Sequence, residues 1–252
     1  MRNIKLILEY DGSYFSGFQR QPNRLSVQEA LESALSEFFD RPMKIQAASS
    51  RTDAGVHASC QVVNFKTESR RDLAQIQKAL NAILPPAIAV KEIEEVPGDF
   101  HSRYSVRSKT YEYWVWNHPV RSPLIAARVY HVPHKLDLVK MRRAAGILTG
   151  RHDFKSFCAS GSTAGKKGNT VRTIHKLELK KEGALLKFRI QADGFLYRMV
   201  RNIVGTLLEI GEGKRPSSEI GKIIQAKNRA KGGRTAPARA LTLVGTSDKP
   251  CY

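Results

Sequence analysis

The sequence predicts an α+β protein made of two halves, residues 1–103 and 104–252, with the same order of elements. First, apolar periodicity along the chain indicates the order β-α-β-β-α-β twice. Second, 252 residues with a hydrophobic fraction of 41% suffice for a proper core. Third, the charge differs sharply between the halves. Two such halves can join at their edges into one long, mostly antiparallel sheet, with helices on one face and a cleft on the other.

The elements of the first half follow from periodicity and capping residues. Ser26 and Asp72 are typical helix N-caps, and Pro85 and Pro86 end the second helix. The expected elements are a strand at 4–10, a helix at 26–39, strands at 43–47 and 61–65, a helix at 72–84 and a strand at 88–96.

The second half repeats this order with one additional helix. A turn at Glu182–Gly183 joins two of its strands. The two halves share this order of elements but show no repeat in their amino-acid sequences. The expected elements are an aromatic strand at 109–117, a helix at 138–148, a strand pair within 171–192, helices at 197–211 and 217–229 and a strand at 240–246.

The charge distribution predicts a polyanionic partner. Residues 1–100 carry 12 Lys and Arg against 13 Asp and Glu, whereas residues 101–252 carry 30 against 10, for a formal net charge of +19. Such one-sided charge repels itself unless a polyanion lies against it. Because neutralised phosphates release condensed counterions, the charge favours nucleic-acid binding over a basic surface that only keeps the protein soluble.

Other classes of protein lack support in the sequence. The apolar run near the N-terminus is too short for a signal peptide, and no stretch reaches transmembrane length, so we expect a cytoplasmic protein that binds no membrane. The seven histidines form no HxxxH, HxH or HExxH pattern, and the three cysteines form no CxxC pair. We therefore expect no metal.

The stretch "SSRTDAGVHASC", residues 49–60, places Arg51, Asp53 and His57 around one glycine, in the connection between the second and third strands. As a turn former, Asp53 would bond its own backbone. As a metal ligand together with His57, it would need a third ligand. As a nucleophile, it would need a cation that keeps it ionised and oriented. Composition alone favours the turn.

Two further motifs combine aromatic or basic residues with apolar ones. In "TYEYWVWN", Tyr111, Tyr113 and Val115 share one face of a strand. Such rings pack in a core, or a ring at the start of the strand can stack on a nucleobase. In "YRMVRNIVG", Arg198 and Arg201 flank the apolar stripe of a helix. They can extend to solvent or pair with a carboxylate across a cleft.

Two segments interrupt the regular pattern. The stretch "CASGSTAGKKGN", residues 158–169, is small and polar and predicts a mobile loop. The stretch "KNRAKGGRTAPARA", residues 227–240, contains five basic residues. It is either a plain linker or a segment that binds phosphate.

At these residues the sequence closely resembles the tRNA pseudouridine synthase A family. The matching segments are "YDGSYFSGFQRQ" from residue 10, "RTDAGVHA" at 51–58, "FHSRYSVRSKTYEYWV" from residue 100 and "MVRNIVG" from residue 199. The resemblance implies a tRNA uridine isomerase of two ferredoxin-like halves that share a sheet, with the active-site cleft between them. It also implies tRNA as the partner, no cofactor and no metal, and a homodimer.

The same resemblance assigns roles to four residues. Asp53 matches the catalytic aspartate, which forms the covalent adduct with the target uridine. Tyr111 matches the tyrosine that stacks on the uracil, Arg201 the arginine that pairs with the catalytic carboxylate, and Arg51 an arginine that holds the flipped-out nucleotide. The first half would then carry the catalytic Asp and the basic second half would dock RNA, with targets at tRNA positions 38–40 in the anticodon stem-loop.

Two other functions fit parts of the sequence. An RNA-binding protein or chaperone would use the charge and leave Asp53 idle, and a metal-dependent phosphoesterase would use Asp53 with His57. The sequence departs from the family pattern at Ser50 and Ala240, where glycine is common. These departures remove no candidate catalytic side chain.

Overall fold

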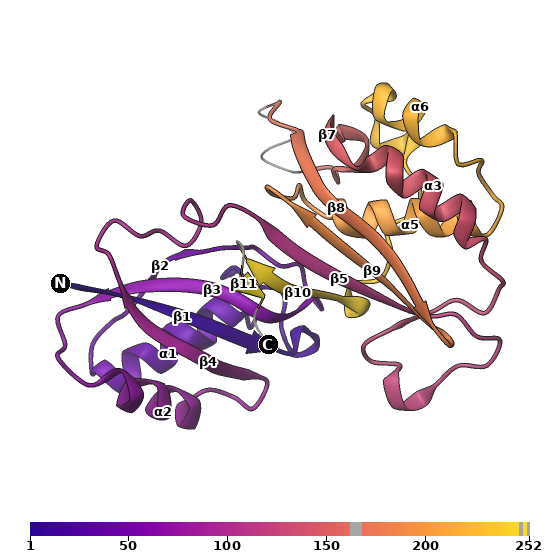
Figure 1. The fold of residues 1–252 in the computed structure, drawn as a ribbon. Helices are drawn as coiled ribbons and strands as arrows, with labels where there is room; N and C mark the ends of the chain where they lie inside the picture. Colours follow the sequence, from indigo (N-terminus) through magenta and orange to yellow (C-terminus); the bar gives the residue numbers. More distant parts are fainter. Residues whose placement is uncertain (162–167, 247–248, 251–252) are drawn as a thin grey trace. The chain divides into compact units, whose positions relative to one another are not determined.

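The computed structural model describes residues 1–161, 168–246 and 249–250 and divides the chain into two compact units (Figure 1). The first unit consists of residues 1–107 and 242–252, and the second of residues 108–241. The predicted α+β class is confirmed. The boundary lies after residue 107 instead of 103, and the C-terminal strand lies with the first unit. That the units share one sheet and enclose a cleft stays a prediction.

The first unit has the predicted order β-α-β-β-α-β, and its central strands lie in the order β4-β1-β3. Strand β1 is antiparallel to both neighbours, and β2 pairs antiparallel with β3. The elements are β1 (Arg2–Tyr10), α1 (Val27–Phe39), β2 (Ile45–Ala48), β3 (His57–Thr67), α2 (Leu73–Ile83) and β4 (Ile88–Val96).

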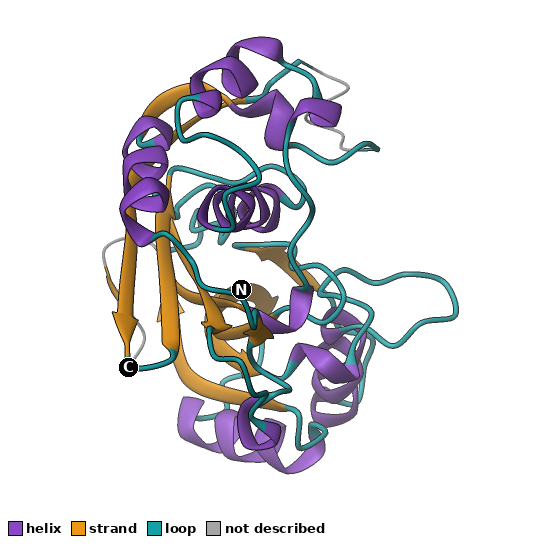
Figure 2. Ribbon diagram, turned by 90° about the vertical axis from the view of Figure 1, so that its right-hand side faces the viewer, coloured by secondary structure: helices purple, strands orange, loops and turns teal. Residues whose placement is uncertain are grey.

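Helices α1 and α2 lie side by side against the sheet of this unit (Figures 1 and 2). Both predicted caps are confirmed. The Ser26 hydroxyl accepts a hydrogen bond from the N–H of Glu29 at 3.2 Å, and the Asp72 carboxylate accepts one from the N–H of Ala74 at 2.9 Å.

The sheet of the first unit has two different faces, because side chains alternate along each strand. The ring of Phe65 on β3 lies 6.0 Å from the ring of Phe39 on α1, so this face meets the helices. Ile7 and Val62 belong to a separate buried cluster, against which Phe100 packs. Their register places them on the opposite face of the sheet.

A buried amide cluster lies on that opposite face. The Asn64 amide nitrogen donates to the side-chain oxygens of Asn3 at 3.0 Å and Gln46 at 2.9 Å. The Asn64 oxygen accepts from both the N–H of Ser102 at 3.1 Å and its hydroxyl at 2.8 Å. Asn3, Asn64 and Ser102 are all buried. The cluster therefore connects three strands to the turn that follows β4.

The last strands of the chain belong to the first unit because of their pairing. Strand β10 (Leu241–Thr246) runs parallel to the start of β3, with Thr242 opposite His57. Strand β11 (Lys249–Pro250) pairs antiparallel with β10. Strand β10 pairs with the first residues of β3, and β2 pairs further along the same edge.

The second unit is built on an antiparallel sheet in the order β5-β9-β8-β7, with β6 parallel to β5. Its elements are β5 (Lys109–Trp116), β6 (Tyr130–His131), α3 (Leu138–Leu148), β7 (Gly150–Asp153), β8 (Val171–Glu182), β9 (Leu185–Ala192), α5 (Met199–Gly211) and α6 (Glu219–Ala226). Short 3-10 helices in the two units are η1 (Gly12–Tyr14), η2 (Pro123–Ile125), η3 (Phe154–Phe157), η4 (Arg229–Lys231) and η5 (Ala238–Ala240).

Helix α5 begins two residues later than its periodicity predicts. Arg198, in front of its first residue, has a left-handed backbone with φ of +59° and so cannot continue a right-handed helix. The short strands β6 and β7, of two and four residues, are not among the elements that periodicity predicts.

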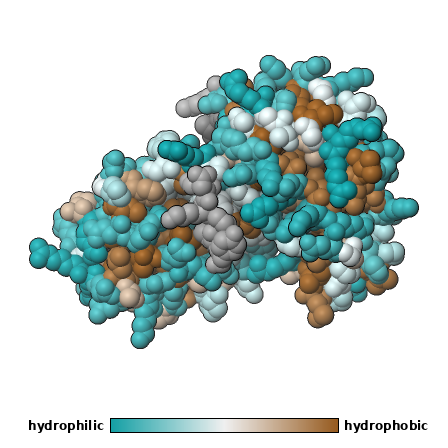
Figure 3. Space-filling model, in the orientation of Figure 1, coloured by the Kyte–Doolittle hydropathy of each residue, from teal (hydrophilic) through white to brown (hydrophobic). Residues whose placement is uncertain are grey.

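In the part of the chain that the structure describes, no helix is both long and apolar enough to cross a membrane. On the face shown in Figure 3, apolar residues form separate patches on a largely hydrophilic surface. Scattered apolar side chains of this kind are normal for a folded domain.

We predict that Asn64→Ala lowers the free energy of unfolding by roughly 3 kcal/mol, because it leaves buried groups of Asn3 and Ser102 without this partner. The control Ser102→Ala removes one hydroxyl and keeps the backbone bond to Asn64, so it should cost about 1 kcal/mol. Urea unfolding of both variants measures the difference. Equal losses in the two variants would contradict a central role for Asn64.

Candidate active site

Asp53 occupies the first position of a tight turn between β2 and β3. The N–H of Val56 donates to the C=O of Asp53 at 3.1 Å, and Gly55 takes the left-handed conformation with φ of +77°. Asp53 is half-buried, whereas Arg51 is exposed. The turn interpretation is therefore correct for the backbone, and it leaves a chemical role of the carboxylate open.

The segment that follows β1 holds the residue in front of Asp53. The N–H of Phe18 donates to the C=O of Thr52 at 3.1 Å, and the hydroxyls of Tyr10 and Thr52 are hydrogen-bonded at 2.7 Å. Thr52 is buried. Asp53 thus follows a residue that is fixed through both its backbone and its side chain.

Two glycines allow this close approach. A Cβ at Gly12 would lie 2.0 Å from the C=O oxygen of Val56, a distance that no side chain tolerates. Gly17 has φ of +102°, and a Cβ there would lie 2.8 Å from the C=O oxygen of Thr52. The glycines of "YDGSYFSG" are therefore explained by packing against the Asp53 turn.

His57 supports the same segment. Its side chain is 1% exposed, and its Nδ1 lies 3.1 Å from the N–H of Gly12 and 3.1 Å from a carboxylate oxygen of Asp11. Nδ1 accepts from Gly12 only when it carries no proton and donates to Asp11 only when it does, so the two contacts are alternatives. Among the described residues, no three His, Cys, Asp or Glu side chains are grouped so that they could hold a metal ion.

The beginning of the loop is anchored to β3 through Gln61. The Ser49 hydroxyl donates to the Gln61 side-chain oxygen at 2.9 Å, and the Gln61 amide nitrogen donates to the C=O of Ser50 at 2.6 Å. Because the second bond uses the backbone of residue 50, it does not depend on the side chain at that position.

In the second unit, Tyr111 lies on β5 and is buried, with 6% of its surface exposed. Its ring meets that of Phe195 edge-on, with centroids 5.1 Å apart and planes at 90°. Phe195 is half-buried and precedes α5. The sequence motifs do not identify Phe195, although its place between strand and helix, next to the motif of α5, is a signal for it.

Tyr113, two residues along the same face of β5, packs in the core as expected. Its hydroxyl donates to the C=O of Pro237 at 3.0 Å. Burial raises the pKa of Tyr113 far above its ordinary value, and the smaller opposing effect of Arg201 does not offset this. The phenol of Tyr113 therefore stays neutral at physiological pH.

Arg201 lies in the first turn of α5 and is held by a segment that we name the strap, residues 229–237. Its Nε donates to the C=O of Ala236 at 2.7 Å, and the N–H of Ala236 donates back to the C=O of Arg201 at 3.1 Å. The first bond fixes the plane of the guanidinium, and the second fixes the strap against the helix.

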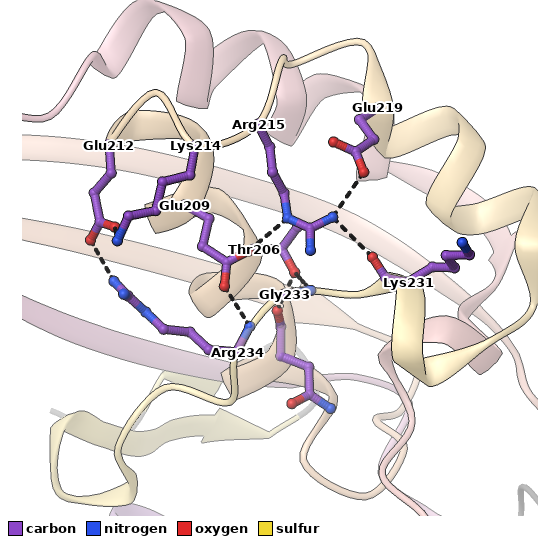
Figure 4. A network of polar contacts seen from close by, with 10 residues as sticks. Thr206, Glu209, Glu212, Lys214, Arg215, Glu219, Lys231, Gly233 and Arg234 are labelled. Carbon is purple, nitrogen blue, oxygen red and sulfur yellow. Dashed lines mark hydrogen bonds and ion pairs between the residues drawn. The ribbon is translucent and has the colours of Figure 1, made fainter.

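The strap continues along one face of α5 (Figure 4). The N–H of Gly233 donates to the Thr206 hydroxyl at 2.9 Å, and the N–H of Arg234 donates to the Glu209 carboxylate at 2.8 Å. A Cβ at Gly205 would lie 1.8 Å from the C=O oxygen of Arg234. Helix and strap are therefore in backbone contact at Gly205.

Asn202 connects the strap to the rest of the unit. It is fully buried, and its amide nitrogen donates to the C=O of Phe157 at 2.8 Å. Its oxygen accepts from the Thr235 hydroxyl at 2.6 Å and from the Arg229 guanidinium at 3.0 Å. The side chain next to Arg201 thus makes three bonds to surrounding segments.

Two basic residues of the segment 227–240 point into the protein. Arg229 binds Asn202, and Arg234 binds Glu212 at 2.5 Å. Burial raises the pKa of Glu212, but hydrogen bonds from Lys214 and Arg234 outweigh burial and leave that pKa below its ordinary value. The linker interpretation is therefore wrong for residues 229–237, where Arg229 and Arg234 serve the fold.

Part of the other irregular segment lies outside the described residues. These are residues 162–167 of the loop expected at 158–169. Before them, the N–H of Ala159 donates to the C=O of Tyr197 at 3.0 Å, so the beginning of the loop is attached in front of α5.

The four candidate residues are divided between the two units. Arg51 and Asp53 share one loop of the first unit, and Tyr111 and Arg201 lie on β5 and α5 of the second unit.

Comparison with known proteins supports a single family. A family model described as tRNA pseudouridine synthase matches residues 6–105 and 144–247, which include Arg51, Asp53 and Arg201 but not Tyr111. A tRNA pseudouridine synthase A from Acetivibrio thermocellus is 47% identical over 97% of this chain and 98% of its own length. Relatives with the same name from Caldicellulosiruptor saccharolyticus and Geobacillus kaustophilus are each 43% identical, over 97% and 96% of this chain and 98% and 93% of their own lengths.

We predict that Gly205→Ala destabilises the protein by roughly 1–3 kcal/mol, because its Cβ would overlap the backbone of the strap. Helix propensity alone would give the opposite sign, a gain of about 0.5–1 kcal/mol. The control is Gly146→Ala in α3, whose Cβ would meet no described atom within 4 Å and which should stabilise the helix. Thermal unfolding measures both variants, and a stabilised Gly205→Ala would contradict the close contact.

Proposed function

The chain belongs to the tRNA pseudouridine synthase family, and we propose that it isomerises uridine in the anticodon stem-loop of tRNA, at positions 38–40, with Asp53 as the nucleophile. The reaction class, conversion of uridine to pseudouridine, is that of the family. The observation that carries the assignment of Asp53 is its place in a fixed turn within "RTDAGVHA".

The reaction requires a nucleophile and neither a redox step nor external energy. The C1′–N1 bond breaks, the uracil turns over, and a C1′–C5 bond forms. C5 loses a proton and N1 gains one, so the atoms balance. A carboxylate can attack either C1′ or C6 and is released unchanged at the end. A half-buried Asp in a fixed turn suits this role, because its carboxylate starts from one defined position.

The other three candidates complete the proposed site. Arg201 supplies the permanent positive charge that keeps a nucleophilic carboxylate ionised. Tyr111 stacks on the uracil, is suitably placed for the C5 proton, and has Phe195 at its edge as a second aromatic wall. Arg51, exposed next to the Asp53 turn, contacts the flipped-out nucleotide. The site requires that both units contribute to one cleft.

Docking of RNA is assigned to the basic second half. A paired or stacked target base must be extruded from the RNA at a cost of a few kcal/mol. Phosphate contacts made by the basic residues offset that cost. The proposal also includes a homodimer in the cytoplasm that acts without a cofactor, and the mass of the protein in solution tests the dimer.

We predict that Asp53→Asn lowers turnover by at least about a thousandfold, the scale expected for loss of a nucleophile, and leaves tRNA affinity nearly unchanged. The substitution removes the charge and keeps the size of the side chain. Release of tritium from tRNA labelled at C5 of uridine measures turnover, and filter binding measures affinity.

The matched control is Asp40→Asn at the exposed end of α1, where φ of +49° suits Asn as well as Asp. It should turn over like the wild type. Turnover of Asp53→Asn close to the wild-type value would refute the nucleophile, and pseudouridine mapped outside positions 38–40 would refute the target.

We also predict that tRNA affinity falls by about 10³ or more between 50 and 200 mM salt, as expected for about six or more phosphate contacts. The physical reason is counterion release at the basic second half. Binding isotherms at several salt concentrations measure the slope, and an affinity independent of salt would count against this docking surface.

A further inference from the structure

The turn between β4 and β5, residues 97–105, lies on the face of the first sheet that α1 and α2 do not cover. Phe100 packs there against the cluster that contains Ile7 and Val62. The register of β1 and β3 places this cluster opposite to the helix-facing residues. The turn is therefore attached to the face of the sheet opposite the two helices.

Hydrogen bonds hold the backbone of this turn in one arrangement. Ser102 is buried and donates twice to Asn64, and the amide of Asn3 donates to the C=O groups of Pro97 and Phe100, each at 2.9 Å. The turn is also closed on itself, because the C=O of His101 accepts from the N–H groups of Tyr104 and Ser105, each at 2.9 Å.

This fixed turn presents an aromatic ring and a cation to solvent. Tyr104 is 74% exposed. Its ring lies 4.6 Å from the imidazole of His101, with an angle of 31° between the planes, and the guanidinium carbon of Arg103 lies 5.5 Å from its centroid. One exposed Tyr is ordinary. An exposed ring with an imidazole and a guanidinium beside it, on a backbone held by buried bonds, is suited to bind another planar group.

We propose that His101, Arg103 and Tyr104 form a second RNA contact, which stacks an unpaired nucleobase of the tRNA and neutralises a neighbouring phosphate. The inference rests on tRNA being the substrate, as in the proposed function. Every base has a π face, so the contact adds affinity without reading sequence. Arg103 supplies the charge for the phosphate, and the exposed ring of Tyr104 supplies the π face for the base.

The test compares tRNA binding by the full-length wild type, Tyr104→Ala, Tyr104→Phe and Arg103→Gln. Tyr104→Ala should weaken affinity about tenfold, because one stacked base is lost. It should leave the slope of log affinity against log salt unchanged. Tyr104→Phe should bind like the wild type, because the ring remains. Arg103→Gln should weaken affinity and lower the slope of log affinity against log salt by about one. The control Val139→Ala removes another exposed apolar side chain, on α3, and should change nothing.

Thermal unfolding should be the same in all five proteins, since the substituted side chains are exposed. Turnover at saturating tRNA should also be unchanged, so the loss in Tyr104→Ala appears in KM. Affinity of Tyr104→Ala within twofold of the wild type, or a loss confined to kcat, would overturn the proposal. If the wild type binds tRNA but releases no tritium, the proposed reaction fails, while the binding comparison still decides this contact.

Discussion

Close contact between two backbones is the constraint on which both parts of the proposed site depend. In the first unit Gly12 lies against Val56 at the end of the Asp53 turn, and in the second Gly205 lies against Arg234 of the strap. A Cβ at either glycine would overlap a C=O oxygen, at 2.0 and 1.8 Å. Each candidate residue therefore lies next to a segment that cannot shift without a loss of packing.

The hydrogen bonds that hold Thr52 and Arg201 use neutral partner groups. Thr52, beside Asp53, is held by the hydroxyl of Tyr10 and the N–H of Phe18. Arg201 is held through the C=O and N–H of Ala236. Hydrogen bonds of this kind orient a segment without adding a charge of their own.

Periodicity predicted those parts of the fold whose elements are long and regular. The bounds of β4 (Ile88–Val96) and α3 (Leu138–Leu148) agree with the prediction. The partner of β10 could not be predicted, because a strand's own pattern does not identify the strand it pairs with. The sequence motifs identified Asp53 and Arg201, but not the bonds that hold them. A count of charges could not show that Arg234 points inward, because the count is the same whether an arginine faces the protein or the solvent.

Part of the basic charge of the second unit serves the fold itself. Arg229 and Arg234 bind Asn202 and Glu212 and hold the strap against α5, which in turn holds Arg201. Both charges still add to the formal total. The carboxylate of Glu212 offsets the charge of Arg234 at short range, whereas Asn202 binds Arg229 as a neutral partner. The net charge thus determines the attraction of a polyanion from a distance. In the proposed function, the number of phosphates neutralised depends on the basic side chains that reach them and not on the formal charge alone.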